Sequence, residues 1–320
     1  MIQLSDHFDY KRLLRFTLPS IVMMIFTSIY SVVDGFFVSN FAGKTPFAAV
    51  NFIFPVLMIL GCVGFMFGTG GSALIAKTMG EGEREKANDI FSLLVYVGAG
   101  CGVVLAAAGI ALMPQLAALL GAEGELLANS VVYGRIVLCA LPFFTLQMEF
   151  QCLFATAEKP GLGLSVTVAA GVTNMVLDAL FVGVLRWGLE GAAAATAVSQ
   201  LVGGVAPLIY FGRRNDSPLR LGRCRLDGRV LFKACTNGAS ELMSNISASV
   251  VSMLYNAQLM AKAGEDGVAA YGVLMYVSLV FQAVFIGYSV GTAPVIGYHY
   301  GAQNHGELRS LRRKSRRPQR

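Results

Sequence analysis

Eight long apolar stretches constrain this chain more than any other feature of its sequence. Read with a helix-length window, they fall near residues 14–38, 48–76, 89–113, 131–155, 162–185, 190–211, 238–261 and 268–298. About 20 apolar residues cross the hydrocarbon core of a bilayer as a helix, which satisfies all of its backbone hydrogen bonds within one segment. The pattern predicts an all-α, polytopic membrane protein with eight transmembrane helices, with kinks expected at Pro55 and Pro142.

The composition agrees with a membrane protein and argues against other classes. Charged residues make up only 14% of the chain, whereas a soluble domain carries about 25%. The net charge of +6 does not indicate nucleic acid, because the basic residues lie in short segments between the apolar stretches without interleaved aromatic residues. The six cysteines show no paired short spacing and are interpreted as packing residues. We expect the lipid bilayer as a partner and no nucleic acid, and the oligomeric state stays unknown.

The Lys and Arg residues fall almost entirely on one side of the predicted membrane. With the N-terminus inside, twenty-one of them lie in inside segments, and the outside loops hold only Lys44, Arg186 and Lys262. This asymmetry predicts a cytoplasmic N-terminus. We expect a multi-pass protein of the plasma (inner) membrane. Residues 1–15 lack the apolar core of a removable signal peptide, so we expect the first apolar stretch to remain in the protein.

A basic segment separates the first six apolar stretches from the last two. Sliding the sequence on itself by 221 residues aligns Gly70 with Gly291 and Gly80 with Gly301 without a gap, which indicates two parallel bundles. Four spans that such a repeat predicts do not follow, and the sequence does not decide between a truncated product and a real cytoplasmic end. The predicted organisation is a six-helix lobe (1–211), a basic cytoplasmic linker (212–233), the first two helices of a second lobe (234–301) and a basic cytoplasmic tail (302–320).

Few charged side chains lie inside the apolar stretches. Each costs at least about 2.5 kcal/mol at the bilayer centre, which makes it a functional candidate. With a rise of about 1.5 Å per residue, Asp34, Asp178 and Thr196 fall at a similar depth in the outer half of the membrane. Asn174 lies one turn deeper on the face of Asp178, because residues four apart stack on one side of a helix. Two carboxylates, an amide and a hydroxyl are therefore predicted to share one cavity.

These oxygen atoms suit ion coupling in two ways. Asp34, Asn174 and Asp178 offer hard ligands for a cation such as Na⁺, and a carboxyl group in a low-dielectric site also binds and releases protons. The alternative is that the two aspartates are solvated helix ends or caps. Glu241 lies about one turn inside the cytoplasmic end of its span. At that position it could either be solvated or contact a substrate, and the sequence leaves both interpretations open. Glu149 is interpreted as mainly structural.

No catalytic constellation appears in the sequence. The three histidines, His7, His299 and His305, do not form a short metal-binding spacing, and no Gly-rich phosphate loop followed by Lys occurs. We therefore expect no enzymatic activity and no cofactor other than a coupling ion, H⁺ or Na⁺.

Three segments resemble helix motifs of the multidrug and toxic compound extrusion (MATE) family of bacterial exporters. They are residues 31–38 (SVVDGFFV), 174–181 (NMVLDALF) and 188–196 (GLEGAAAAT), and the Gly-containing turns at 79–82 and 300–303 are also similar. The Asn-x-x-x-Asp element followed by Gly-Ala-Ala-x-Ala-Thr is the most specific part, and the similarity covers residues 14–307.

The resemblance implies a twelve-helix exporter of two lobes that works by alternating access and trades inward Na⁺ or H⁺ flow for outward movement of amphipathic or cationic drugs. It implies that Asp34, Asn174, Asp178 and Thr196 form the cation-coupling site. Tyr133 matches a substrate-cavity position, and Glu241 resembles an acidic residue of the seventh helix in some members.

Two other functions stay open at this stage. A lipid-linked sugar flippase of a related superfamily would carry more basic residues in its cavity for pyrophosphate than these spans contain. A non-transporting fragment or assembly partner is the alternative from a different class, and it is motivated by the absence of the last four predicted spans.

Overall fold

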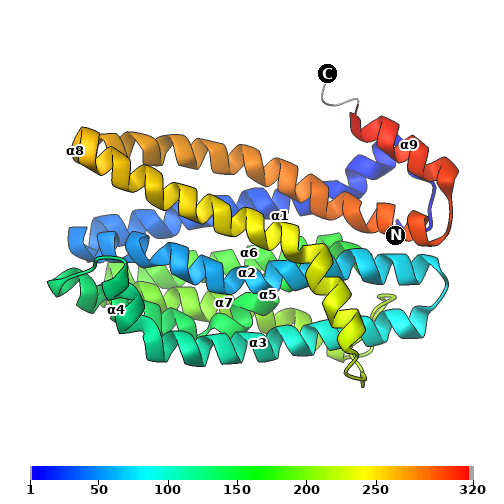
Figure 1. Ribbon diagram of the computed structural model, residues 1–320, viewed down its shortest axis with the longest axis horizontal. Coiled ribbons are helices and arrows are strands. Elements are labelled where there is room, and N and C mark those ends of the chain that lie inside the picture. Colours follow the sequence, from blue (N-terminus) through cyan, green and yellow to red (C-terminus); the bar gives the residue numbers. More distant parts are fainter. Residues whose placement is uncertain (1, 317–320) are drawn as a thin grey trace.

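The computed structural model describes residues 2–316, without the side chains of Lys44, of most residues from 253 to 280 and of 315–316. This part of the chain is helical and contains no strand, which confirms the all-α fold (Figure 1). In chain order its elements are α1 (Tyr10–Phe37), η1 (Val38–Ala42), α2 (Lys44–Gly80), α3 (Arg84–Leu119), α4 (Gly124–Cys139), α5 (Leu141–Thr156), α6 (Pro160–Asp178), η2 (Ala179–Val184), α7 (Gly188–Gly212), α8 (Gly228–Gly301) and α9 (His305–Arg316), where η marks a π-helix.

The first six predicted spans correspond to helices that are long and apolar enough to cross a membrane. Five of these spans are single or π-extended helices. The remaining one, the fourth in chain order, is the pair α4 and α5, which is bent by 60°. The break lies at Ala140, and Pro142 occupies the first turn of α5, where a missing N–H is not needed. The expected kink at Pro142 is therefore a break between two helices.

The seventh and eighth predicted spans both lie in α8. The backbone is helical from Gly228 to Gly301. Residues 262–267, where the sequence predicts an interruption, are therefore helical as well. Figure 1 shows the yellow N-terminal arm and the orange C-terminal arm of α8 running in opposite directions. Most side chains between the arms lie outside the described residues, and the division into two spans stays a prediction.

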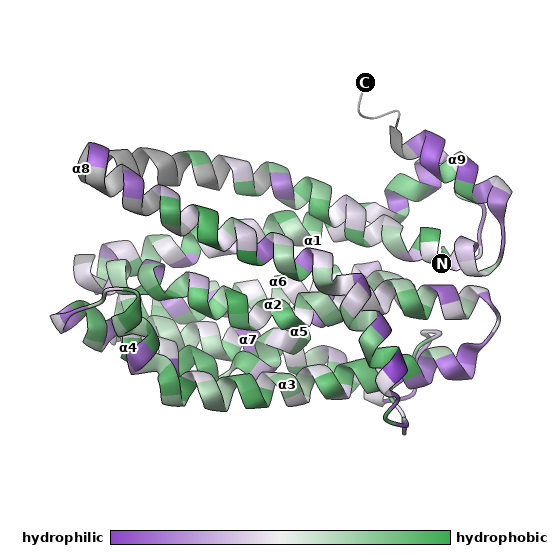
Figure 2. Cartoon of the chain, viewed as in Figure 1, coloured by the Kyte–Doolittle hydropathy of each residue, from purple (hydrophilic) through white to green (hydrophobic). Residues whose placement is uncertain are grey.

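The distribution of polarity is inverted relative to a soluble protein. Large apolar side chains face outward along the helices, with exposed fractions of 68% for Val104 and 59% for Val176, while Asp178 and Glu149 are completely buried. Figure 2 shows apolar residues along the length of the helices and polar residues gathered at the end that holds the N-terminus and α9. Such an apolar outer surface is what a hydrocarbon solvent requires.

Glycines bring α2 and α8 into close contact at two places. A Cβ atom at Gly70 would collide with the carbonyl oxygen of Ala234, in the first arm of α8. Near the ends of both helices, a Cβ at Gly80 would meet the carbonyl oxygen of Tyr298, and one at Gly301 would meet that of Lys77. The two helices therefore pack backbone to backbone at the end of the molecule that carries the N-terminus.

The C-terminal residues form more structure than a basic tail. The side chain of Asn304 accepts the backbone N–H of Glu307 and so caps α9, and Glu307 and Leu311, one turn apart, are buried on one face of it. Residues 228–233, at the end of the predicted linker, are helical and belong to α8. Residues 302–320 contain no apolar stretch, so the sequence predicts only a basic tail there.

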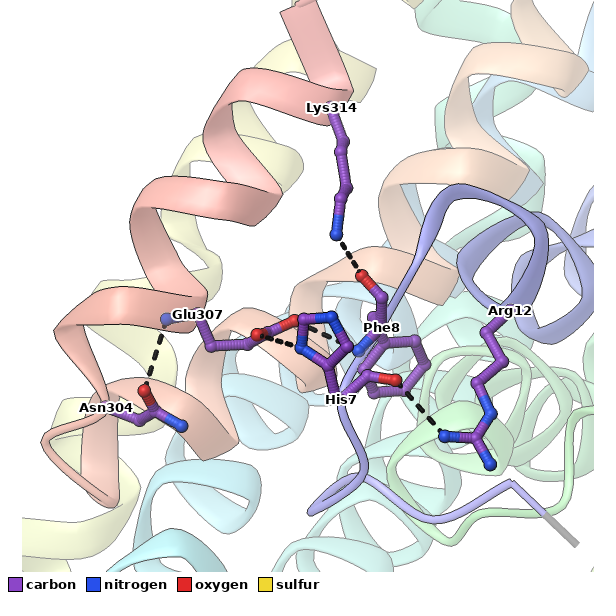
Figure 3. Close-up of polar contacts among 6 residues, drawn as sticks. All are labelled: His7, Phe8, Arg12, Asn304, Glu307 and Lys314. Atoms are coloured by element: carbon purple, nitrogen blue, oxygen red, sulfur yellow. Dashed lines mark hydrogen bonds and ion pairs between the residues drawn. The ribbon is translucent and has the colours of Figure 1, made fainter.

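The segment before α1 is held against α9 by polar contacts (Figure 3). The Nδ1 atom of His7 lies 2.6 Å from Oε2 of Glu307, and the backbone N–H of Phe8 donates to Oε1 of Glu307 at 3.0 Å. The ammonium group of Lys314 donates to the carbonyl oxygen of Phe8, and Arg12 donates to that of His7 at 3.3 Å. The contacts of Glu307 and Lys314 join the two ends of the described chain.

Candidate functional site

A buried polar cluster lies among four helices of the first six-helix bundle. Asp34 comes from α1, Asn174 and Asp178 from α6, Thr196 from α7 and Tyr133 from α4. Asp178, Asn174 and Tyr133 are 0%, 2% and 4% exposed. Asn174 and Asp178 are separated by one helical turn and therefore point to the same side of α6.

The members of this cluster face one another. The carboxyl group of Asp34 interacts with Asp178 and with the Asn174 amide. The Tyr133 hydroxyl faces Thr196 and lies within electrostatic range of both carboxyl groups. The structure thus brings together five of the six residues that the sequence indicated, four as a coupling site and Tyr133 as a cavity residue.

The oxygen atoms of the cluster lack ordinary hydrogen bonds. Oδ1 of Asp34, both carboxyl oxygens of Asp178, Oδ1 of Asn174 and Oγ1 of Thr196 are buried with no well-formed partner among the described residues. Leaving a buried polar group unsatisfied costs about 1 to 3 kcal/mol, so the fold keeps these atoms unpaired at a cost. An ion or proton that bound here would supply the missing interactions.

The donor set limits which ions fit the cluster. Within the described part of the chain, no group of three or more His, Cys, Asp or Glu residues could hold a metal ion. The cluster instead has two carboxyl groups, one amide oxygen and hydroxyl groups, which are hard oxygen ligands. Such a set suits Na⁺ or H⁺ better than a transition metal, which prefers imidazole or thiolate.

Both helices that carry the aspartates change to π-helix just beyond them. The π-helix η1 begins at Val38, four residues after Asp34, and η2 begins at Ala179, directly after Asp178. A π-helical turn is rare and widens the backbone, and it is frequent at functional sites. The sequence had no signal for these turns, because they depend on how α1 and α6 pack against their neighbours.

Two further residues border the cluster and were not identified from the sequence. The Tyr30 hydroxyl interacts with the Gln147 side chain and lies near Asp34. Gln147 projects toward Gly203 of α7, where a Cβ atom would collide with the amide group. Tyr30 lies four residues before Asp34 on the same face of α1, so helical spacing could have indicated it.

Glu241 lies apart from the aspartate cluster. It lines a cavity of about 340 Å³ between α2, α5 and α8, together with Phe65, Phe285 and Cys152. The hydroxyl groups of Ser72 and Thr156 form a hydrogen bond of 2.7 Å in the same region, and Ser72 also lines the cavity. The structure therefore contains two polar regions, one inside the six-helix bundle and one between that bundle and α8.

The fold and the cluster together define a class of protein. A bundle of helices with an apolar exterior and ionisable residues buried at its centre is the arrangement of polytopic membrane transporters. The family model described as MatE matches residues 19–180 and 242–315, which is more than half of the chain. The chain belongs to the MATE family of transporters.

Known proteins similar to this chain agree with the family. Multidrug export protein MepA of Staphylococcus saprophyticus is 25% identical over 292 residues, which cover 91% of this chain and 64% of that protein. The protein of the same description from Staphylococcus aureus (strain MRSA252) is 23% identical over 303 residues, covering 94% of this chain and 67% of that protein. This chain therefore spans about two thirds of the length of these relatives.

Solved structures show the same fold. A crystal structure of MATE in complex with MaD3S superimposes with a TM-score of 0.87 at 23% identity, covering 95% of this chain and 69% of the other. The outward-facing conformation of a multidrug resistance MATE family transporter gives a TM-score of 0.88 over 95% of this chain and 68% of that chain, at 23% identity.

Proposed function

We propose that this chain takes part in secondary active multidrug efflux, exchanging H⁺ or Na⁺ for amphipathic or cationic small molecules across the plasma membrane. The observation that carries the proposal is the cluster of Asp34, Asn174, Asp178 and Thr196, whose buried oxygen atoms have no well-formed partner in the described residues. The similarity to the multidrug export proteins MepA of two Staphylococcus species supports the same proposal.

The coupling step is the binding and release of a cation at the cluster. With both carboxyl groups ionised, two like charges face each other in a buried region, and a bound Na⁺ or H⁺ lowers this repulsion. Asn174 and Thr196 would complete the coordination of Na⁺ through their oxygen atoms. Occupation of the cluster thus changes the electrostatic free energy of packing α1 against α6.

The drug site is proposed to be the cavity that Glu241 lines. Its walls combine the carboxylate of Glu241 with the aromatic rings of Phe65 and Phe285, which suits an amphipathic cation. No Lys or Arg lines this cavity in the described part of the chain. A pyrophosphate-linked sugar would meet an acidic wall there, which disfavours the flippase alternative.

Alternating access is supported by the close contacts between α2 and α8. Under the repeat of 221 residues, Lys77 corresponds to Tyr298 and Gly80 to Gly301. Gly80 packs on Tyr298 and Gly301 packs on Lys77, which is the reciprocal pair of contacts that a two-fold relation between repeats requires. We propose that this contact closes the cytoplasmic side while the opposite side is open.

Asp178→Asn is the central test of the coupling site. In vesicles that contain the protein, we expect efflux of a fluorescent organic cation when a proton gradient or a sodium gradient is applied separately, and the effective gradient identifies the ion. The amide of the variant cannot bind a proton and offers no negative charge, so we expect coupled efflux to fall to background. Glu190→Gln, at an exposed position in the first turn of α7, is the matched control.

Two results would contradict the proposed function. One is efflux by Asp178→Asn at the rate of the unchanged protein, which would place coupling elsewhere. The other is no gradient-driven efflux by the unchanged chain in vesicles where its insertion is verified, which would favour a non-transporting role.

A further inference from the structure

Glu149 is a second buried carboxyl group, separate from the aspartate cluster. It lies on α5, is 0% exposed and projects toward Gly98 of α3. Gln147, two residues earlier, projects toward Gly203 of α7 and interacts with Tyr30. Residues two apart point to nearly opposite sides of a helix, so α5 stands between Glu149 and the side of the bundle that holds Asp34.

The structure provides no bond for this carboxyl group. Both of its oxygen atoms are buried without a hydrogen-bond partner among the described residues. Among the described residues, the titratable groups within electrostatic range of Glu149 are the thiols of Cys101 on α3 and Cys152 on α5, and Cys152 is also in range of Glu241. None of these groups carries a positive charge, so an ionised Glu149 would be an uncompensated buried charge.

Glycines make the space that Glu149 occupies. A Cβ atom at Gly98 would collide with Oε2 of Glu149. A Cβ at Gly68 of α2 would crowd the backbone of Glu149 and the Cβ of Cys152. Gly98 therefore leaves room for the carboxyl group itself, and Gly68 lets α2 approach the α5 backbone that carries it.

The carboxyl group of Glu149 lies next to the cavity that Glu241 lines. Cys152, one helical turn after Glu149, lines the cavity together with Glu241 and Thr69. Residues three apart lie on the same side of a helix, so Glu149 and Cys152 are neighbours. The Cys152 side chain thus connects the lining of the cavity to the face of α5 that carries Glu149.

We propose that Glu149 is a second proton-binding site that exchanges protons with the cavity between α2, α5 and α8. The proton enters from water in the cavity and forms an O–H bond with a carboxyl oxygen of Glu149. It returns to water in the cavity when that side of the molecule opens. This inference goes beyond the proposed function, because Glu149 binds its proton whether or not the chain exports drugs.

Dicyclohexylcarbodiimide tests the proposal directly. This apolar reagent reacts with a protonated carboxyl group: the carboxyl oxygen bonds to the carbodiimide carbon, and the proton moves to a carbodiimide nitrogen. The purified 320-residue chain in lipid vesicles is treated at neutral pH, and the adducts are mapped by peptide mass spectrometry. We expect an adduct on Glu149 and none on the solvated carboxylate of Glu190.

A matched pair of variants identifies the reacting group. Glu149→Gln removes the adduct from its peptide, whereas Glu190→Gln leaves the Glu149 adduct unchanged. Infrared difference spectra of the unchanged protein against Glu149→Gln supply a measurement that does not depend on access of the reagent. We expect a carboxylic acid C=O band that is lost in Glu149→Gln at neutral pH.

The outcomes separate this proposal from the proposed function. Absence of the acid band in the difference spectrum, with a carboxylate band in its place, would overturn the second proton site. An adduct on Glu149 no greater than that on Glu190 would also overturn it. Loss of drug efflux in Asp178→Asn with an intact Glu149 adduct would support both, because the two sites then behave independently.

Discussion

Single glycines determine how closely the helices of this protein approach one another. Gly301 allows the C-terminal end of α8 to rest on the carbonyl oxygen of Lys77, and backbone cannot move aside as a flexible side chain can. By contrast, nothing lies within 4 Å of a Cβ atom built at Gly161, in the first turn of α6. The two positions therefore separate packing effects from the general effect of replacing glycine.

Gly301→Ala is expected to destabilise the protein. Inserting a methyl group into a closely packed contact costs about 1 to 3 kcal/mol. Gly161→Ala, which meets no neighbour, is expected to be neutral or to stabilise by about 0.5 to 1 kcal/mol. Thermal unfolding of both variants in the same detergent measures the difference, and equal midpoints would contradict the close contact.

Glu158 provides a pH-dependent contribution to stability outside the membrane. It lies between α5 and α6, and burial raises the pKa of its carboxyl group above the usual value, although the Leu4 N–H donates to it at 2.7 Å. The folded protein therefore binds this proton more tightly than the unfolded chain, and stability falls as pH rises through the titration range.

Glu158→Gln is expected to remove this pH dependence. The amide oxygen of Gln still accepts the Leu4 N–H but does not ionise. The unfolding free energy of the unchanged protein minus that of the variant should fall as pH rises from about 4 through the titration of Glu158. Denaturant titrations at several pH values measure it, and a constant difference would refute the assignment.

At the scale of elements, α9 connects the end of α8 to the segment before α1. Its buried residues Glu307 and Leu311 face that segment, and Glu307 binds both His7 and the backbone of Phe8 (Figure 3). The amphipathic spacing of this short helix is visible in the sequence once its cap at Asn304 is noticed. The partner of Glu307 is His7, 300 residues earlier in the chain. That pairing cannot be recognised in the sequence.

Glu307→Ala is expected to release the segment before α1. The change removes the acceptor of two hydrogen bonds, and losing a hydrogen bond to a charged group costs about 1.5 to 3 kcal/mol. Hydrogen exchange of the backbone N–H of Phe8 should accelerate at least tenfold, since about 1.4 kcal/mol corresponds to that factor. Glu83→Ala, at an exposed turn, serves as the control, and unchanged exchange at Phe8 would contradict the contact.

At the scale of the whole molecule, the ends of the helix bundle differ in polarity and charge. The turn between α2 and α3 lies at the same end as the N-terminus, and the turn between α3 and α4 lies at the opposite end (Figure 1). The basic residues predict that the first of these ends faces the cytoplasm. The orientation stays a prediction of the charge pattern.

Two single-cysteine variants on a background without the native cysteines test this orientation. Glu85→Cys, at the start of α3, is expected to react with a membrane-impermeant maleimide only in inside-out vesicles. Glu123→Cys, in the turn before α4, is expected to react only in right-side-out vesicles. The opposite pattern would reverse the predicted topology.

The sequence by itself predicted the solvent, the helical class and a shared depth for the main polar residues. Apolar length has to match bilayer thickness, and a constant rise per residue places Asp34, Asp178 and Thr196 at one depth without any knowledge of packing. Local spacing likewise predicted that Asn174 and Asp178 share one face of α6. These features follow from residues that are near one another in the chain.

Only the tertiary structure decided which polar groups are left without partners. Glu149 and Asp178 look alike in the sequence, yet one meets Gly98 and two thiols, and the other meets Asp34. The π-helices beyond both aspartates, the approach of Tyr30 to Gln147 and the docking of α9 also depend on distant segments. Contacts between residues far apart in sequence are set by the packing of whole helices, and a single sequence does not record that packing.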